Sequence, residues 1–184
     1  MKVWTEGTGK GTQIQNLWTF LNHHYPTGCN IVRGDKMTVD HFNDPRDVAF
    51  RSTYANSINM TFQNMIQARA NNFQGIRLYD RLHLSEVVYG QKYREYDCEH
   101  IYKIENAVAD LDDVYLITFV DEVDNLVSRD DGLGFTSDPK EIEKEKAAFI
   151  LAHNDSCIKN AKVININGLS IDDVFAMVLR FIGE

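Results

Sequence analysis

Short runs of β-branched and aromatic residues alternate along this chain with longer segments of helical character, and this alternation constrains the fold more than any other feature. The strand-like runs are residues 2–5, 29–33, 76–80, 114–120 and 162–167. The helical segments between and after them are residues 10–25, 46–73, 95–110, 138–153 and 170–182. Such alternation predicts a parallel sheet with helices on both faces. We therefore expect an α/β fold with a five-stranded parallel sheet flanked by helices.

Two aspartate–proline pairs mark the starts of predicted helices. Asp44-Pro45 and Asp138-Pro139 each place a capping carboxylate before a proline at the first helical position. No repeat, low-complexity tract or interdomain linker interrupts the 184 residues, of which 43% are hydrophobic. This length and apolar content are typical of one folding unit. We expect a single domain over residues 1–184.

The formal net charge is −8, and the charge is unevenly placed. Residues 1–94 hold 11 basic and 7 acidic side chains, whereas residues 95–184 hold 8 basic and 20 acidic ones. Affinity for a phosphate polymer or an anionic bilayer needs a surplus of Lys and Arg. The balance therefore argues against a nucleic-acid polymer or a membrane as partner. It is compatible with a local basic pocket for a small anion in the first half.

Cysteine usage and the N-terminal residues favour a cytoplasmic location. Cys29, Cys98 and Cys157 are odd in number and far apart, and they include no CxxC pair, so neither a disulfide framework nor a zinc ribbon is indicated. The N-terminal stretch lacks the apolar core of a signal peptide. No run approaches the roughly 18 apolar residues of a membrane span.

A glycine-rich turn joins the first predicted strand to the first predicted helix. It reads Lys2-Val3-Trp4-Thr5-Glu6-Gly7-Thr8-Gly9-Lys10-Gly11-Thr12-Gln13. Glycines let backbone N–H groups converge on an anion, and the helix N-terminus adds partial positive charge. A lysine neutralises phosphate oxygens and a hydroxyl binds magnesium. We predict a phosphate-binding loop whose nucleotide contacts come from Gly7, Gly9, Lys10, Gly11, Thr12 and Gln13.

This loop departs from the usual G-x-x-x-x-G-K-[ST] pattern. Counting back five residues from Gly9 reaches Trp4 where the pattern has glycine, and Gly11 stands where most such loops carry the hydroxyl. Two other interpretations stay open. One is an ordinary glycine turn that feeds a helix, and the other is a shortened loop that binds phosphate less well or not at all.

A second block carries the resemblance to a known family. Residues 76–90 read Ile-Arg-Leu-Tyr-Asp-Arg-Leu-His-Leu-Ser-Glu-Val-Val-Tyr-Gly. Asp80-Arg81 at a strand end, with Ser85 and Tyr89 behind it, resembles the D-R-x motif of thymidylate kinases, most of all the phage-type thymidylate or deoxynucleoside monophosphate kinases. The resemblance covers most of the chain. It implies a P-loop kinase fold, ATP and Mg²⁺ as cofactors, a small nucleotide as substrate and a homodimer.

The glycine-rich turn shares in this resemblance. Glu6-Gly7 and Gly9-Lys10 are similar to parts of the family's E-G-x-D-G-x-G-K-x-T element, although three residues between Gly7 and Gly9, including the family's aspartate, are missing. If Lys10 alone is aligned, Glu6 loses its match.

The resemblance also implies a catalytic set. Lys10 holds the donor phosphates, Asp80 and Arg81 stand between donor and acceptor, and Arg129 begins a lid over residues 129–138 as a cation above the transferring phosphoryl group. The family's second lid arginine has no counterpart here. The alternative interpretation of Asp80-Arg81 is an ion pair with a structural role only.

Magnesium is expected at Thr12, Glu6 and Asp80. Thr12 supplies the hydroxyl, and Asp80 ends an internal strand, where open α/β sheets place their ligands. Glu6, at another strand end, either polarises magnesium-bound water or is a solvated turn residue.

Five residues are candidates for binding the acceptor nucleotide. The resemblance implies that Arg33, which ends the second predicted strand, contacts the acceptor phosphate, and Arg94 meets either a phosphate or solvent. Tyr54, Asn56 and Tyr89 offer the aromatic face and amide or hydroxyl partners that a base needs, but aromatic residues at helical spacing are more often part of the core.

Among the histidines, His83 stands beside the proposed site and is interpreted as a bystander. The six histidines show no paired metal-ligand spacing, so no zinc site is indicated.

The function expected from these features is transfer of the ATP γ-phosphoryl group to dTMP or a related deoxynucleoside monophosphate. Two alternatives stay open: a deoxynucleoside kinase, such as a thymidine kinase, which needs a general base for a 5′-hydroxyl acceptor, and a nucleotide-binding protein impaired in turnover by the short loop. The apolar stripe of residues 50, 54, 58, 62, 65 and 66 packs either on the sheet or on a second subunit.

Overall fold

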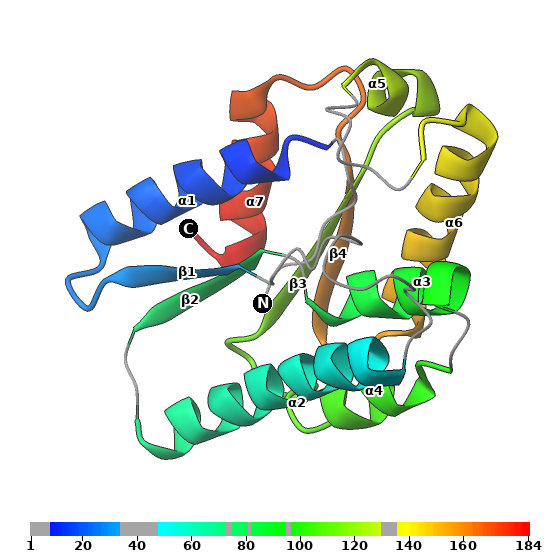
Figure 1. The fold of residues 1–184 in the computed structure, drawn as a ribbon. Helices are drawn as coiled ribbons and strands as arrows, with labels where there is room; N and C mark the ends of the chain where they lie inside the picture. The colour runs from blue at the N-terminus through cyan, green and yellow to red at the C-terminus, as the bar shows by residue number, and fades with distance from the viewer. Residues whose placement is uncertain (1–7, 34–47, 73–74, 81, 95–96, 130–135) are drawn as a thin grey trace.

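A computed structural model describes residues 8–33, 48–72, 75–80, 82–94, 97–129 and 136–184, and for residues 33, 48–57 and 94 it describes the backbone alone (Figure 1). Helices and strands alternate along the described chain, as the sequence predicts. In chain order they are α1 (Lys10–His24), β1 (Cys29–Arg33), α2 (Val48–Ala70), β2 (Ile76–Asp80), α3 (His83–Arg94), α4 (Glu99–Glu105), β3 (Tyr115–Val120), α5 (Val123–Ser128), α6 (Pro139–Asp155), β4 (Asn160–Asn165) and α7 (Ile171–Ile182).

The strands pair in two parallel sheets. β1 pairs with β2 from Cys29–Ile76 to Arg33–Asp80, and β3 pairs with β4 from Tyr115–Asn160 to Val120–Asn165. The described residues therefore confirm an α/β fold with parallel strands, but a five-stranded sheet is not confirmed. The strand predicted at residues 2–5 lies outside the described residues.

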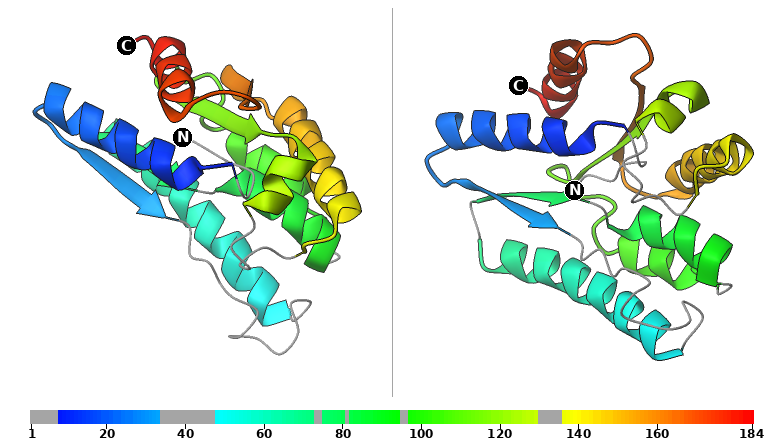
Figure 2. Two further views of the ribbon diagram at one scale, coloured as in Figure 1. Left: turned by 90° about the horizontal axis from the view of Figure 1, so that it is seen from above. Right: turned by 45° about the horizontal axis from the view of Figure 1, so that its top comes forward.

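Helices cover the strands on two sides, because neighbouring strand residues face opposite ways. Leu78 on β2 and Ile117 on β3 pack with α1 and α7, whereas Tyr79 and Leu116, one position away, pack with α2, α3, α4 and α6. Figures 1 and 2 show α1 beside α7 on one side and α2 beside α4 on the other. The result is a layered core with two apolar clusters.

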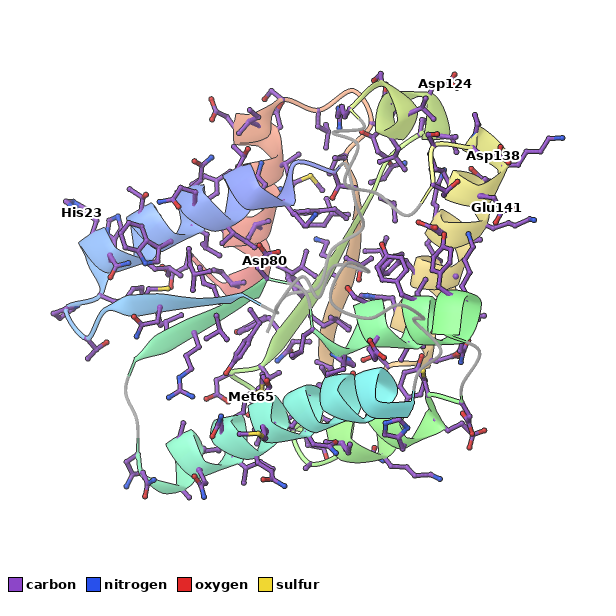
Figure 3. All side chains as sticks on the ribbon, viewed as in Figure 1. His23, Met65, Asp80, Asp124, Asp138 and Glu141 are labelled. Carbon is purple, nitrogen blue, oxygen red and sulfur yellow. The ribbon has the colours of Figure 1, made fainter. Side chains whose placement is uncertain are left out.

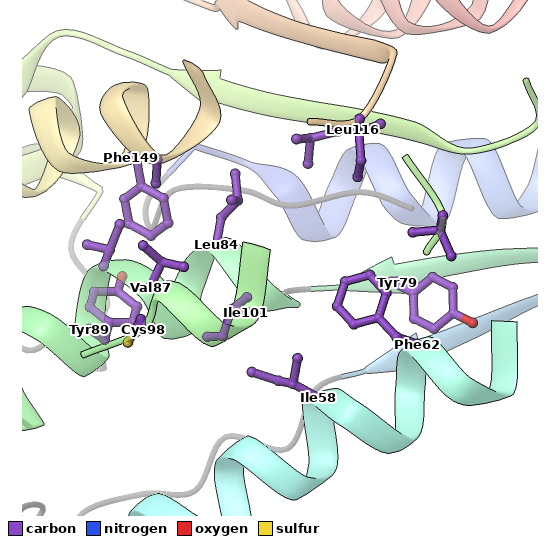
Figure 4. Close-up of a cluster of buried hydrophobic side chains, with 14 residues drawn as sticks. Ile58, Phe62, Tyr79, Leu84, Val87, Tyr89, Cys98, Ile101, Leu116 and Phe149 are labelled. Carbon is purple, nitrogen blue, oxygen red and sulfur yellow. The ribbon is translucent and has the colours of Figure 1, made fainter. Parts of the chain in front are cut away.

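Most described residues of the predicted apolar stripe, which lies on α2, pack into one of these clusters. Ile58 and Phe62 are buried and point into the cluster (Figure 4), and Met65 is partly buried against it. Among the stripe residues whose side chains are described, only Ile66 is an exposed large hydrophobic residue. Packing on the protein's own core therefore explains the stripe at these positions without a second subunit, and the homodimer stays a prediction.

Local capping explains where several helices begin and end. Asp138 accepts a hydrogen bond from the N–H of Lys140 at 3.0 Å, with Pro139 at the first helical position, as predicted. Ser170 and Asp173 form a reciprocal capping box at the start of α7. The Asp44-Pro45 pair lies outside the described residues, and the described part of α2 starts at Val48.

The strand predicted at residues 162–167 lies two positions earlier, as β4 at Asn160–Asn165. The helix predictions also differ from the structure. The helix predicted over residues 95–110 is shorter, because α4 ends at Glu105 and tight turns follow. The structure also contains two helices that the sequence did not predict, α3 with 12 residues after β2 and α5 with 6 residues after β3. No described helix is long and apolar enough to cross a membrane.

Candidate functional site

The start of α1 has the backbone shape expected of an anion-binding helix terminus. Gly9, directly before the helix, has φ 68° and ψ 18°, a left-handed conformation that glycine adopts readily. Its carbonyl oxygen accepts hydrogen bonds from the N–H groups of Thr12 and Gln13 at 3.1 and 3.3 Å. The first turn of α1 contains no acidic side chain that would neutralise the positive end of the helix. A phosphate group suits such a terminus.

The side chains in this first turn have different surroundings. Gln13 is buried, and its Nε2 donates to the backbone oxygen of Ile171 at 2.9 Å, which ties the start of α1 to the start of α7. Its Oε1 is buried and has no hydrogen-bond partner within the described chain. Gly11 and Thr12 are exposed, and Lys10 is half-buried. Their nucleotide-binding roles stay predictions.

Asp80 lies at the carboxyl end of β2, in register with Arg33 at the end of β1. The pairing brings the backbones of these two predicted site residues side by side. Figure 3 labels Asp80 at the end of its strand. Asp80 Oδ1 is buried and has no hydrogen-bond partner among the residues described. An unsatisfied buried carboxylate oxygen is costly, so this oxygen is a candidate ligand for a cation or for a donor group of a substrate.

A polar cluster occupies the carboxyl ends of β3 and β4. Asp121, whose side chain is 0% exposed, follows β3 directly and accepts hydrogen bonds from Glu122 N (2.8 Å), Asn125 Nδ2 (2.8 Å) and Arg129 Nη1 (2.7 Å). Asn125 Nδ2 also donates to Asn167 Oδ1, which follows β4, at 3.2 Å. The cluster thus spans the same edge of the sheet at which parallel strands place ligands.

Arg129, predicted to begin the lid, is the C-cap residue of α5. Its side chain is 46% exposed and is engaged with Asp121. A role above a phosphoryl group would require this guanidinium to leave Asp121 or to share it with a ligand. Residues 130–135 of the predicted lid lie outside the described chain, and the catalytic role of Arg129 stays a prediction.

Tyr89, a predicted base-binding residue, is 4% exposed within the core (Figure 4). Its ring meets Phe149 edge-on, with 5.5 Å between the ring centroids. The structure therefore explains Tyr89 by packing, and its contact with a base stays a prediction.

The other predicted site residues are placed only in part. The structure puts Tyr54 and Asn56 on α2 and Arg94 at the end of α3, without their side chains. Glu6, Gly7 and Arg81 lie outside the described residues, so their roles stay predictions.

The sequence analysis missed a buried ion pair next to Asp80. His83 Nε2 lies 2.6 Å from Glu105 Oε1, and both side chains are 0% exposed. The pair joins the start of α3 to the end of α4. The prediction that His83 is a bystander does not include this contact, and nothing in the sequence distinguishes Glu105, which is 22 positions away, from the other acidic residues of the second half.

Glu105 is ionised despite its burial. Burial alone would raise its pKa, but the hydrogen bond from His83 and the charge of His83 lower it, as do the hydrogen bonds from Ser156 Oγ and Cys157 N. These bonds are 2.6 and 3.0 Å long. Together they hold the pKa of Glu105 at about 2, below its ordinary value of 4.5.

Magnesium is compatible with the residues present, although they do not form a complete protein cage. Within the described residues, no group of three or more His, Cys, Asp or Glu side chains is placed to hold a metal ion. Mg²⁺ at kinase sites is commonly held by one or two carboxylates together with substrate phosphates. The unpartnered Asp80 Oδ1 and the exposed Thr12 fit that more limited requirement.

Comparison with solved structures identifies the type of fold. The chain is similar to thymidylate kinase from Candida albicans, with a TM-score of 0.62 and 15% sequence identity over 98% of this chain and 90% of that one. It is also similar to thymidylate kinase from Ehrlichia chaffeensis, with a TM-score of 0.58 and 18% identity over 98% of this chain and 97% of that one. No protein-family model and no curated protein sequence matches the chain. The resemblance expected from the sequence is thus confirmed for the fold.

Proposed function

We propose that this chain is an ATP-dependent nucleotide kinase that transfers the γ-phosphoryl group to dTMP or to a related deoxynucleoside monophosphate. The observation that carries the proposal is the buried Asp80 Oδ1, which has no hydrogen-bond partner among the described residues, at the strand end where Arg33 lies in register. The thymidylate kinase-like fold and the open start of α1 at Gly9 support it. Phosphoryl transfer needs positioned cations and carboxylates more than covalent chemistry, and this edge of the sheet offers both.

The donor phosphates would lie at the start of α1. The N–H groups of the first turn and the amine of Lys10 are the groups that would hold them, with Gly9 and Gly11 leaving room for close approach. Within the described residues, an added Cβ at either glycine would meet no atom within 4 Å. The backbone therefore leaves space where a ligand is expected.

The acceptor would lie beside the ends of β1 and β2. The backbone of Arg33 pairs with that of Asp80, which supports the proposal that Arg33 contributes a cation for the acceptor phosphate. Arg81 and Arg94 are further predicted contacts. Tyr54, Asn56 and Tyr89 are proposed for the base side of the site. Arg129 would contribute a second cation after releasing Asp121, to which it is paired.

Magnesium would be held by Asp80 and Thr12, with Glu6 as a further predicted ligand. When bound, it neutralises phosphate charge and orients the phosphate oxygens. The protein's own part is to present the Asp80 carboxylate, whose Oδ1 accepts no hydrogen bond from the described residues. Asp80→Asn is expected to lower the apparent affinity for Mg²⁺ in titrations monitored by turnover.

A steady-state assay that couples ADP release to NADH oxidation tests the proposed reaction. The wild-type chain is expected to release ADP with dTMP or another deoxynucleoside monophosphate and ATP–Mg²⁺. Turnover with thymidine instead would indicate a nucleoside kinase. Nucleotide binding without turnover on any acceptor would indicate a binding protein, the result that the short loop at Gly7–Gly9 would explain.

We also propose a cytoplasmic homodimer with a small-molecule substrate and no nucleic-acid or membrane partner. The exposed Ile66 on α2 supports a subunit contact there. Multi-angle light scattering tests it: a mass near twice 21.1 kDa is expected, and a mass near 21.1 kDa would contradict it.

A further inference from the structure

Glu105 is the meeting point of three separate parts of the chain. Its carboxylate accepts hydrogen bonds from His83, the first residue of α3, and from Ser156 and Cys157, which link α6 to β4. Glu105 itself ends α4. One buried anion therefore fixes the start of α3 relative to α4 and to the approach to β4.

The far side of His83 is also enclosed. Its ring stacks edge-on against Phe62 of α2, with 5.4 Å between centroids and 72° between planes. At its other end, α3 is tied to α6 by Lys92, whose Nζ lies 3.0 Å from Glu141 and 3.2 Å from Glu145. Both ends of α3 are thus held, and the buried end is the one that follows Asp80 by three residues.

Stability alone is a poor explanation for such a pair. Removing a carboxylate and an imidazole from water costs free energy, and well-packed apolar side chains in their place are often as stabilising or more so. A buried ion pair does, however, favour one relative placement of its elements over alternatives. Compared with an apolar contact, the His83–Glu105 pair therefore adds a defined placement of the start of α3.

That helix start lies where unsatisfied polar atoms gather. Among the described residues, five buried side-chain polar atoms have no hydrogen-bond partner, and three of them, Asp80 Oδ1, His83 Nδ1 and Ser85 Oγ, fall within six consecutive positions. Buried polar atoms in native proteins are nearly always paired. Asp80 Oδ1 and Ser85 Oγ are therefore candidates for meeting a polar ligand, whereas His83 Nδ1 belongs to a fully buried ring.

We infer that His83 and Glu105 are positioning residues of the proposed phosphoryl transfer, because they hold the start of α3, and with it Asp80, in the placement that the reaction needs. The inference rests on the proposed function. His83 is accordingly part of the supporting structure and not a bystander. Neither side chain is assigned contact with the substrate.

The test compares variants that keep the fold but change the pair. In His83→Phe/Glu105→Leu both polar side chains are replaced by apolar groups, so neither is left buried without its partner. We expect this variant to unfold at a urea concentration close to that of the wild type while its kcat with dTMP falls at least tenfold and its KM for ATP changes less than twofold. His83→Gln, whose amide can still donate to Glu105, is expected to regain at least a third of the wild-type kcat.

Thr118→Val/His153→Phe is the matched control. Thr118 Oγ1 and His153 Nδ1 form another buried hydrogen-bonded pair, 2.9 Å long, between β3 and α6. Its loss is expected to leave kcat within twofold of the wild-type value. An equal loss of kcat in this control would show a general effect of buried polar pairs and overturn the inference.

The remaining outcomes are also decisive. A folded His83→Phe/Glu105→Leu variant with kcat within twofold of the wild type overturns the inference and leaves the proposed function standing. If that variant does not fold, Ser156→Ala is the deciding variant, because it removes one hydrogen-bond donor from Glu105. A loss in kcat of three- to tenfold in Ser156→Ala supports the inference, and an unchanged kcat overturns it. A wild-type chain that turns over no acceptor overturns the proposed function and the inference with it.

Discussion

The guanidinium of Arg129 lies 2.7 Å from the carboxylate of Asp121, and this ion pair joins the end of β3 to the end of α5. The two partners are unequal, because the Asp121 side chain is fully buried and the Arg129 side chain is 46% exposed. An exposed cation exchanges its partner for water or a ligand at low cost, whereas a buried carboxylate does not. Arg129 is therefore the movable partner and Asp121 the fixed one.

Asp121→Asn is expected to destabilise the protein by about 1–3 kcal/mol, because a buried acceptor of charge-assisted hydrogen bonds becomes a weaker, neutral one. Urea unfolding followed by circular dichroism measures the change. Asp124→Asn is the matched control, since Asp124 is exposed in the first turn of the same helix (Figure 3). It is expected to cost no more than about 0.5 kcal/mol, and equal effects of the two variants would contradict the prediction.

Acidification is expected to destabilise the protein in two steps. Burial lowers the pKa of His153 below 6.5, although the charge of Glu105 opposes the shift. The unfolded chain therefore binds more protons at this residue, so stability is lost as the pH falls below about 6.5. Glu105, with its pKa lowered from 4.5 to about 2, adds a second loss as the pH falls from about 4.5 towards 2.

Urea midpoints measured between pH 4 and pH 8 check the first step. His153→Gln is expected to flatten the dependence between pH 7 and pH 5, because no titratable group remains at that position. His23→Gln, a change at an exposed position of α1 (Figure 3), serves as the control and is expected to keep the wild-type slope. A His153→Gln variant with the wild-type slope would show that His153 does not cause the first step.

The sequence predicted the parts of the fold that depend on local pattern. The strands at Cys29–Arg33 and Ile76–Asp80 have the predicted bounds, because short β-branched runs with buried alternate faces are legible in sequence. The resemblance to thymidylate kinases also named Asp80 and Arg129. The polar contacts around Arg129 were not predictable in the same way. Asp121 and Asn167 both hydrogen-bond to Asn125, and they lie close together only because β3 and β4 are neighbours.

The same reason explains why the Glu105 network was missed. His83, Glu105 and Ser156 are brought together by tertiary packing across three elements, and no local pattern marks them. Burial of the α2 stripe at Ile58 and Phe62 likewise depends on how α2 packs against α3 and α4. The spacing of hydrophobic residues shows that one face of a helix is buried, but it does not show which elements cover that face.

Cys157 is expected to react slowly with thiol reagents although the residue is exposed. Burial of the thiol raises its pKa, and the hydrogen bond to Glu105 Oε2 (3.2 Å) and the charge of Glu105 raise it further, to about 11. At pH 8 only about one thiol in a thousand would be the reactive thiolate. Glu105→Gln removes the charge and is expected to speed alkylation of Cys157 by iodoacetamide about tenfold.

Intact-mass spectrometry over time measures this reaction. Cys157→Ser identifies the signal, because Cys29 and Cys98 are buried and are expected to remain unmodified in the folded protein. Alkylation of Cys157 at the same rate in the wild type and in Glu105→Gln would contradict the assigned cause of the raised pKa.

Two neighbouring glycines provide a test of the backbone at the start of α1. Gly9→Ala is expected to destabilise the protein by about 1–2 kcal/mol, because Gly9 has φ 68°, a conformation that L-residues with a Cβ adopt at a cost. Gly11→Ala, two positions on and within the helix, is expected to stabilise it by about 0.5–1 kcal/mol, since alanine loses less entropy on folding there. Within the described residues, neither added Cβ meets an atom within 4 Å, so steric clash does not separate the two variants. Thermal and urea unfolding are expected to give shifts of opposite sign, and shifts of the same sign would show that the left-handed turn at Gly9 is not maintained in solution.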